Sequence, residues 1–429
     1  MNDMNKNNTV LRFMTCGSVD DGKSTLIGRL LYDTKTILTD TLSQIEKTSK
    51  KKGMTALDLS LITDGLQAER EQGITIDVAY RYFSTGSRKY IIADAPGHEQ
   101  YTRNMVTAAS TSQLAIILVD ARKGMLTQTR RHSYLTKLVG IKHIIVAVNK
   151  MDLVNYDENE YQTICDEYNS FASAIKLDQP EVTISFIPMS ALNGDMIVDR
   201  GDSLDWYKGA TLLETLENID ATEETKNSQL RFPIQLVCRP RDSANEELHD
   251  FRAFMGKIES GSLKVNDKIK VLPSSHESTI KEIRIGEELI SEATYEQSVT
   301  VSLNDEIDIS RGDMIVKKDD NITSTKNFTA NVCWLSESNL NINRTYLIMH
   351  TTRLSKAKIS SINNKININT LDAEQATELK TNDIANINFK LAQPLIVDQY
   401  AQNRSTGAFI IIDETTYHTV GAGMIETLE

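Results

Sequence analysis

The most telling segment of this chain reads Gly17-Ser18-Val19-Asp20-Asp21-Gly22-Lys23-Ser24. It fits the pattern Gly-x4-Gly-Lys-Ser/Thr, in which glycines let backbone N–H groups turn inward around a polyphosphate. An apolar, strand-like run at 10–16 precedes it, and a helix-compatible run at 24–31 follows it. The N-terminus of such a helix adds partial positive charge. The segment therefore predicts a strand, a phosphate-binding loop and a helix in succession.

Two side chains of this loop have expected roles. Lys23 is expected to reach the β- and γ-phosphates of a nucleotide, and the Ser24 hydroxyl is expected to ligate Mg²⁺. The alternative is a glycine-rich turn that matches the pattern by chance. The strand before the loop and the helix after it argue against that alternative.

The first half of the chain alternates strand and helix patterns up to about residue 220. Continuous apolar strands joined by helices predict a mainly parallel sheet covered on both faces, and such sheets bind ligands beyond their carboxyl strand ends. The expected strands are Val10–Cys16, Lys89–Asp94, Gln113–Asp120, His143–Val148 and Val182–Ile187, with helices at Thr129–Leu138 and Tyr161–Ile175.

The motif Asp94-Ala95-Pro96-Gly97 begins at the end of the second expected strand. An aspartate at a strand end can hold Mg²⁺, usually through water, and the Gly97 N–H can then bond a γ-phosphate. His98 follows, where it would position the attacking water. The alternative for His98 is an ordinary surface-loop histidine.

Two further motifs follow later strands and point to guanine. Asp152 of Asn149-Lys150-Met151-Asp152 can accept hydrogen bonds from guanine N1–H and the 2-amino group, whereas adenine offers no matching donors. Asn149 is expected to brace the loops, and the Lys150 stem to cover the base. The backbone of Ser190-Ala191-Leu192 is expected to bond guanine O6. Taken alone, the tetrapeptide also fits a surface Asn-Lys turn, and the tripeptide has almost no specificity.

The run Gly73-Ile74-Thr75-Ile76-Asp77 lies between the loop and Asp94, and Thr75 is expected to ligate Mg²⁺ near the γ-phosphate. The alternative is a strand-forming threonine. The charged residues 67–72 before it suit a segment ordered by nucleotide. Five motifs in this order predict a GTPase with two conformational states, with Lys23, Thr75 and His98 as catalytic residues. The expected ligands of Mg²⁺ are Ser24, Thr75 and Asp94; the expected nucleotide contacts are Gly17, Ser18, Val19, Asp20, Asp21, Gly22, Lys23, Ser24, Thr25, Asp94, Ala95, Pro96, Gly97, His98, Asn149, Lys150, Met151, Asp152, Ser190, Ala191 and Leu192.

Short alternating strands replace this pattern after the polar segment 221–229. They predict two β-barrels. The expected fold is an α/β P-loop GTPase domain at 1–225 with helices on both faces of its sheet, a barrel at 226–325 and a second barrel at 326–429. The expected barrel strands are Phe232–Cys238, Phe251–Ile258, Lys268–Val271, Thr279–Ile285, Lys365–Asn369, Ile384–Leu391 and Ala408–Ile412.

Through residue 220 the chain resembles the G domain of the translation-factor GTPase superfamily. Ser18 and Asp21 stand where elongation factor Tu usually has histidines. The chain more specifically resembles the GTPase subunit of bacterial ATP sulfurylase, although Ala95 stands where that family usually has threonine. The runs that resemble it are Thr15–Leu31, Asp64–Asp77, Pro96–Met105, Asp305–Asp313 and Asn403–Phe409, while residues Asp242–Leu248 look like a small insertion.

This resemblance implies a function in sulfate activation. The family couples GTP hydrolysis, with Mg²⁺, to the formation of adenylyl sulfate and pyrophosphate from ATP and sulfate, and a smaller subunit carries the adenylylation site. The resemblance therefore implies a smaller catalytic partner. Two alternatives stay open: a translation GTPase that delivers aminoacyl-tRNA, and a nucleotide-dependent binding module without coupled chemistry.

Composition narrows the possible partners and compartment. The net charge of −12 disfavours nucleic acid and anionic membranes as partners. No apolar run approaches the ~20 residues of a membrane span. Four widely spaced cysteines without a Cys-x-x-Cys pair favour buried, reduced thiols in the cytoplasm over a zinc site.

Overall fold

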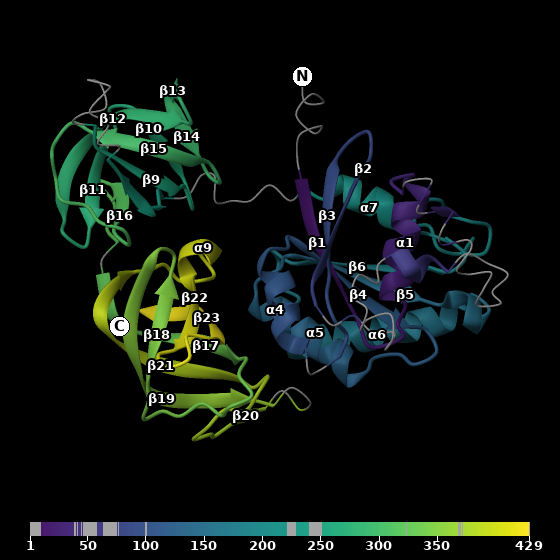
Figure 1. The fold of residues 1–429 in the computed structure, drawn as a ribbon. Coiled ribbons are helices and arrows are strands. Elements are labelled where there is room, and N and C mark those ends of the chain that lie inside the picture. The colour runs from purple at the N-terminus through teal and green to yellow at the C-terminus, as the bar shows by residue number, and fades with distance from the viewer. Residues whose placement is uncertain are drawn as a thin grey trace. The chain divides into compact units, whose positions relative to one another are not determined.

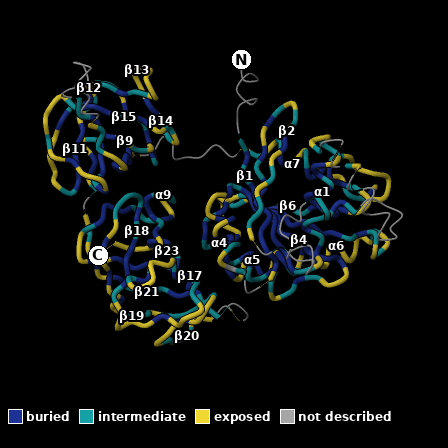
Figure 2. The backbone as a smooth tube through the Cα atoms, in the orientation of Figure 1, coloured by how far each residue is buried: buried dark blue, intermediate teal, exposed yellow. Residues whose placement is uncertain are grey.

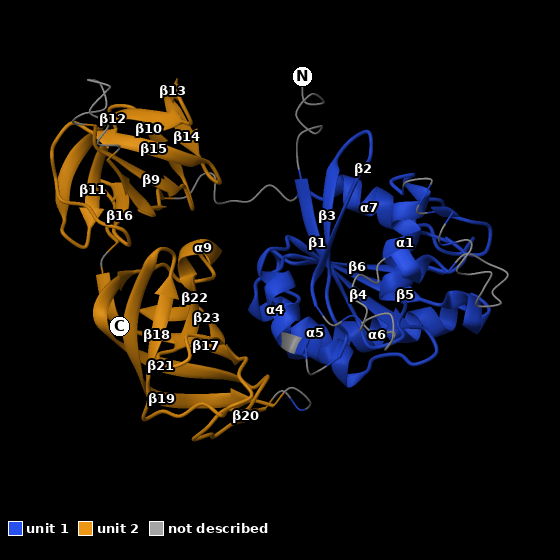
Figure 3. Cartoon of the chain, in the orientation of Figure 1, with its two compact units in different colours: residues 1–221, 368–371 blue, residues 222–367, 372–429 orange. Residues whose placement is uncertain are grey.

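The computed structural model describes residues 10–37, 40, 42–43, 45, 58–62, 75, 77–98, 101–220, 229–239, 251–322, 324–367, 370 and 372–428. The chain divides into two compact units (Figure 3). Unit 1 comprises residues 1–221 with 368–371, and unit 2 comprises residues 222–367 with 372–429.

Unit 1 is built on a six-stranded sheet in the order β2-β3-β1-β4-β5-β6. Parallel pairing joins β1 to β3 and β4, β4 to β5, and β5 to β6. The edge strand β2 runs antiparallel to β3 and was not predicted from the sequence. The strands are β1 (Val10–Cys16), β2 (Ala79–Ser84), β3 (Lys89–Asp94), β4 (Leu114–Asp120), β5 (His143–Asn149) and β6 (Thr183–Pro188).

Helices cover both faces of this sheet, which confirms the predicted fold class (Figure 1). On one face Leu26 of α1 and Leu216 of α7 share a buried cluster with Phe13 of β1. Because both faces are covered, all seven residues of β4 are buried, as a central parallel strand requires. The helices are α1 (Lys23–Asp33), α4 (Thr102–Ser110), α5 (Thr127–Leu138), α6 (Glu158–Ala174) and α7 (Leu212–Asn218), with single 3₁₀ turns η2 (Leu59–Ile62) and η4 (Met151–Val154).

The first barrel of unit 2 closes through the segment 231–238, which pairs with β16 and then with β9. The sequence predicted one strand here, at Phe232–Cys238, but the structure has two. The break falls where the segment changes partner: Ile234 N donates to Asp313 O, and Gln235 N donates to Met255 O. The strands are β7 (Phe232–Pro233), β8 (Leu236–Cys238), β9 (Ala253–Lys257), β10 (Ser262–Lys264), β11 (Lys268–Leu272), β12 (His276–Ile285), β13 (Glu288–Ile290), β14 (Glu292–Thr294), β15 (Ser298–Leu303) and β16 (Met314–Lys317).

The second barrel is a ring of six strands, β18-β22-β23-β17-β21-β19, closed by pairing between β18 and β19. The predicted strand Lys365–Asn369 is confirmed only at Lys365 and Ile366, which end the long strand β19; Asn367 is not part of a strand, and residues 368 and 369 lie outside the described part. The elements are β17 (Ser324–Trp334), β18 (Thr345–His350), β19 (Arg353–Ile366), β20 (Ala373–Glu374), β21 (Ile384–Ile396), α9 (Arg404–Gly407), β22 (Ala408–Asp413) and β23 (Thr419–Leu428).

Each barrel has its own apolar core, one around Phe232 and Ile269 and the other around Trp334 and Phe389. Figure 2 shows both cores as dark blue tube enclosed by exposed turns. The separate cores agree with two barrel domains, while the exact boundaries at 225 and 325 remain a prediction.

Candidate nucleotide-binding site

The carboxyl ends of the parallel strands meet at one edge of the sheet in unit 1. Strand register places Thr15 opposite Asp94, Asp120 opposite Asn149, and Val148 opposite Pro188. Four of the five predicted motifs, those of Gly17, Asp94, Asn149 and Ser190, begin at or just beyond one of these strand ends. The register therefore gathers motifs that lie far apart in the sequence.

The phosphate loop ends at Gly22, and α1 begins at Lys23. Gly22 has a φ of 95°, and a Cβ there would collide with the amide nitrogen of Asn149. Lys23 Nζ donates to the carbonyl oxygens of Gly17 at 3.0 Å and Ser18 at 2.9 Å. Burial lowers the pKa of Lys23, against the opposing charges of Asp94 and Asp21. A buried cation therefore lies against the loop in which the sequence predicts a polyphosphate.

Asp21 shapes the loop from its buried side. Its side chain is 1% exposed, and Oδ2 accepts the N–H of Ser18 at 2.6 Å. Burial raises the pKa of Asp21, although the nearby Lys23 lowers it in part. Its neighbours differ, since Asp20 is exposed with a φ of 68° and Val19 is half-buried. The carboxylate of Asp21 thus closes the turn of the loop.

The Asp94-Ala95-Pro96-Gly97 segment lies directly against the phosphate loop. A Cβ on Gly97 would stand 2.5 Å from Gly17 O and 2.6 Å from Lys23 Nζ, so only glycine allows this approach. Asp94 is buried and accepts from Thr15 Oγ1 at 3.3 Å. Ala95 and Pro96 are buried as well. This contact joins the predicted γ-phosphate sensor to the predicted phosphate loop.

His98 is exposed at the end of this segment, with its ring centroid 6.1 Å from that of Tyr101. Its exposure leaves the ring accessible to a ligand, while the neighbouring residues 99 and 100 lie outside the described part. The predicted role of His98 in positioning water therefore stays a prediction.

Asn149 connects the phosphate loop with the two loops predicted to read the base. Its Nδ2 donates to Asp21 O at 2.8 Å, and its Oδ1 accepts the N–H of Ala191 at 2.9 Å. Ser190 Oγ donates to Asp152 Oδ1 at 2.7 Å. These are the contacts of a residue that braces both loops, and they bring three sequence motifs into one site.

The other members of the two base motifs differ in exposure. Lys150 has a φ of 65°, donates through Nζ to Asp20 O, and lies 3.0 Å from Asp120 Oδ2. Met151 is fully buried. Leu192 is 58% exposed. The stem of Lys150 thus crosses from the base motif to the phosphate loop.

The two hydroxyl residues predicted to ligate the metal, Ser24 and Thr75, are half-buried, as is the predicted nucleotide contact Thr25. Residues 73, 74 and 76 of the Thr75 motif lie outside the described part. Among the described residues, no group of three or more His, Cys, Asp and Glu side chains is placed to hold a metal. A Mg²⁺ here would need hydroxyl groups, one carboxylate and nucleotide oxygens, which is a donor set that Mg²⁺ accepts.

Sequence reasoning missed Asp120, which ends β4 at the same edge of the sheet, here called the strand-end rim. It accepts two hydrogen bonds from the Arg122 guanidinium, at 3.0 and 2.7 Å, and pairs with Lys150. Burial raises the pKa of Asp120, but these partners outweigh burial and hold the pKa below its ordinary value. The signal was available, because Asp120 follows a continuous apolar strand, as Asp94 does.

Two family models match the chain. The elongation factor Tu GTP binding domain matches residues 8–223, and the GTP-eEF1A C-terminal domain-like model matches residues 327–426. Sulfate adenylyltransferase subunit 1 of Colwellia psychrerythraea is 51% identical over 422 residues, covering 98% of this chain and 88% of that protein. The chain belongs to the sulfate adenylyltransferase subunit 1 family.

Other members of the family match equally well. Subunit 1 of Aliarcobacter butzleri is 51% identical over 98% of this chain and 88% of its own length. Subunit 1 of Cellvibrio japonicus is 49% identical over 97% of this chain and 86% of its own length. A solved structure of sup35 complexed with GDP aligns with 98% of this chain and 94% of its own, at 21% identity and a TM-score of 0.44, too remote a likeness for a functional argument.

As a member of this family, the chain is a GTPase subunit of sulfate adenylyltransferase, and unit 1 contains its GTP-binding domain. This membership decides against an elongation GTPase that delivers aminoacyl-tRNA. Within the described residues, no helix is long and apolar enough to traverse a bilayer. The prediction of four buried thiols is wrong for Cys238, which is half-buried because β8 presents it at a barrel edge; Cys16, Cys165 and Cys333 are buried.

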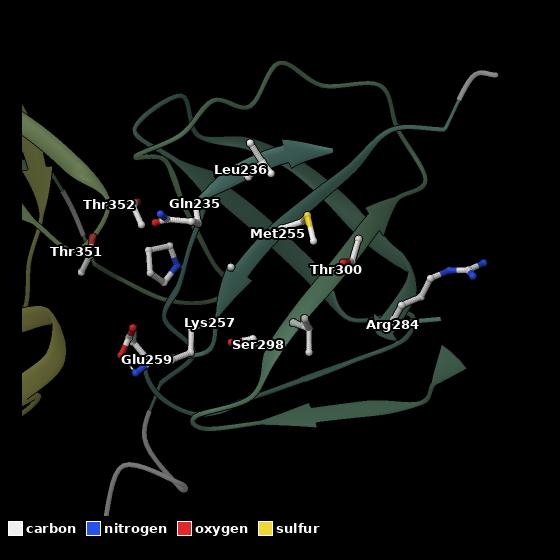
Figure 4. Close-up of a pocket in the computed structure, with 14 residues that line it drawn as sticks. Gln235, Leu236, Met255, Lys257, Glu259, Arg284, Ser298, Thr300, Thr351 and Thr352 are labelled. Atoms are coloured by element: carbon white, nitrogen blue, oxygen red, sulfur yellow. Dashed lines mark ion pairs between the residues drawn. The ribbon is translucent and has the colours of Figure 1, made fainter. Parts of the chain in front are cut away.

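Unit 2 carries a surface hollow of about 540 Å³ that contains no predicted site residue (Figure 4). Its wall combines the exposed apolar side chains Leu236 and Met255 with the ion pair between Lys257 and Glu259, at 3.1 Å. Thr351 and Thr352 of the second barrel complete the rim. The hollow is therefore formed by both barrels of unit 2.

Proposed function

We propose that unit 1 binds GTP with Mg²⁺ at the strand-end rim and hydrolyses it. We further propose that hydrolysis drives the formation of adenylyl sulfate and pyrophosphate from ATP and sulfate on a smaller catalytic subunit. The observation that supports this most strongly is the close approach of Gly97 to Gly17 and Lys23. A γ-phosphate held between these groups would hold the segment 94–98 in one position, and its loss would release that segment.

The phosphate loop would stabilise the charge that develops during hydrolysis. Lys23 and the loop N–H groups would cradle the phosphates, while Ser24, Thr75 and Asp94 would hold Mg²⁺, which neutralises charge on the β- and γ-phosphates. His98 would orient the attacking water. Because Lys23 is buried beside carbonyl oxygens, its charge acts in a medium of low dielectric constant, where it has a larger effect than in water.

Guanine would be read by Asp152, whose carboxylate is oriented by Ser190. Coupling to the partner requires that the GTP and GDP states contact the catalytic subunit differently. The four cysteines are free. We place the reaction in the cytoplasm, where such thiols stay reduced.

The decisive experiment mixes the purified chain with the smaller subunit and measures adenylyl sulfate from ATP and sulfate. We expect GTP to raise the yield and a non-hydrolysable GTP analogue not to. Equal yields with and without GTP would overturn the coupling. Calorimetric titration of the chain alone with GTP–Mg²⁺ tests the site itself, and equal affinity for ATP would overturn the guanine assignment.

A further inference from the structure

Arg29 joins the phosphate-binding helix to the Ser190–Leu192 loop, and it is not among the predicted site residues. It lies six residues after Lys23 in α1, which is about 9 Å along the helix axis. Nε donates to Ala191 O at 3.4 Å, and Nη2 donates to Leu192 O. The guanidinium therefore binds two consecutive carbonyl groups more than 160 residues away in the sequence.

Three neighbours fix the orientation of this guanidinium. Asp33 Oδ1, one turn further along α1, lies 3.6 Å from Nη1, and the Tyr32 ring centroid lies 5.8 Å from Cζ. Gly194 packs against it, since a Cβ there would stand 3.6 Å from its atoms. A planar fork with several N–H donors suits adjacent carbonyl groups, whereas the single ammonium group of lysine does not match both.

The same loop has a second attachment to α1 through Asn149. Ala191 N donates to Asn149 Oδ1, and Asn149 Nδ2 donates to Asp21 O, just before the helix begins. The loop is thus fixed at two points, one at the start of α1 and one near its middle. Two attachments restrict both the distance and the tilt of the loop, which a single hydrogen-bonding group cannot do.

We propose that Arg29 is a positioning residue for base recognition. By holding the carbonyl groups of Ala191 and Leu192, it keeps Ser190 where its hydroxyl orients the Asp152 carboxylate. It links phosphate binding and guanine reading into one rigid part, without itself touching base or phosphate. This inference rests on the proposed binding of GTP in unit 1.

The test compares Arg29→Ala, Arg29→Lys and the control Arg130→Lys in the full chain. Arg130 also forms an ion pair, with Glu167 at 3.0 Å, but lies on α5 outside the predicted site. We measure KM and kcat for GTP and for inosine triphosphate, which lacks the 2-amino group that Asp152 would read. For Arg29→Ala we expect KM for GTP to rise about tenfold, as the loss of one to two hydrogen bonds gives, with kcat within about twofold.

The ratio of kcat/KM for GTP to that for inosine triphosphate separates positioning from plain stabilisation. We expect Arg29→Ala to lower this ratio several-fold, Arg29→Lys to lower it less, and Arg130→Lys to leave it unchanged. An unchanged ratio in folded Arg29→Ala, checked by urea unfolding, would overturn the proposal; if that variant does not fold, Arg29→Lys decides in the same way. If the unaltered chain binds no GTP, the proposed function fails first, which is a separate outcome.

Discussion

The nucleotide rim of unit 1 and the joint between the barrels of unit 2 both bury charged groups, but they stabilise them differently. In the rim, buried Lys23 is bound by two carbonyl oxygens of its own loop. In the joint, Arg231 is held by Asp320 at 2.5 Å and Asp398 at 2.8 Å, and all three are nearly buried. The hydrogen-bond partners of Lys23 are neutral carbonyl groups, whereas the charge of Arg231 already has two carboxylate partners.

The pKa directions follow the same division. Burial lowers the pKa of Lys23 and raises that of Asp21, so burial dominates for these two groups of the phosphate loop. For Arg231 burial also acts to lower the pKa, but the hydrogen bonds and charges of Asp398 and Asp320 outweigh it and raise the pKa. Buried groups whose charged form is disfavoured are candidates for a functional site.

The largest effect is expected from breaking the joint. Arg231→Met leaves two carboxylates without their shared partner, and removing one member of a buried pair costs about 3–5 kcal/mol of unfolding free energy. Urea unfolding measures this loss. The control Lys257→Met breaks the more exposed pair with Glu259 and should cost under about 1 kcal/mol. A loss of unfolding free energy under about 1 kcal/mol for Arg231→Met would contradict a structural role for Arg231 between the barrels. GTP affinity should not change in either variant.

The next effect tests the rim without touching the joint. Gly97→Ala forces a methyl group against Gly17 O, and we expect about a 100-fold loss in kcat/KM for GTP, the size that a small misplacement near reacting groups gives. Gly86→Ala is the matched control, because nothing lies within 4 Å of its added Cβ. Steady-state GTP hydrolysis measures both variants, and similar rates would refute the contact between the two loops.

A smaller effect is expected from the base-reading carboxylate. Asp152→Asn replaces one acceptor oxygen of the carboxylate by an NH₂ donor, which matches the 2-oxo group of xanthine and not the 2-amino group of guanine. Affinity for GTP should therefore fall about tenfold while affinity for xanthosine triphosphate rises, as one or two hydrogen bonds allow. Competition binding with both nucleotides measures the shift. A variant that still prefers GTP would remove Asp152 from base recognition.

The smallest effect is a pH dependence of unit 1. Burial, together with the nearby Lys23, lowers the pKa of His132 to about 3 from 6.5. The unfolded chain therefore binds the proton first, and stability falls as pH drops below 6.5, by about 0.8 kcal/mol at pH 6. His132→Leu should weaken this dependence of stability on pH. If the dependence persists in the variant, a group other than His132 causes it.

Tryptophan fluorescence can follow the two units separately in that experiment. The chain has two tryptophans, Trp206 in unit 1 and Trp334 in unit 2. Burial also lowers the pKa of His350 in unit 2, despite its hydrogen bond to Thr406 O. Both histidines therefore make their unit less stable as the pH falls. Because His132 and Trp206 both lie in unit 1, only the Trp206 signal should respond to His132→Leu.

The sequence by itself determined the candidate site and the order of the folds around it. A phosphate loop acts through the backbone of eight successive residues, and the carboxyl ends of apolar parallel strands must share one edge. The strands leading to Gly17, Asp94, Asn149 and Ser190 were therefore visible, because local pattern alone specifies them.

Only the tertiary structure decided which distant side chains meet. The pairing of Arg231 with Asp398 spans 167 residues, and that of Arg29 with Leu192 spans 163. The antiparallel edge strand β2 and the break between Ile234 and Gln235 likewise depend on which strand lies alongside. Such contacts are chosen by the three-dimensional packing of whole elements, and no local spacing of residues encodes a partner that far along the chain.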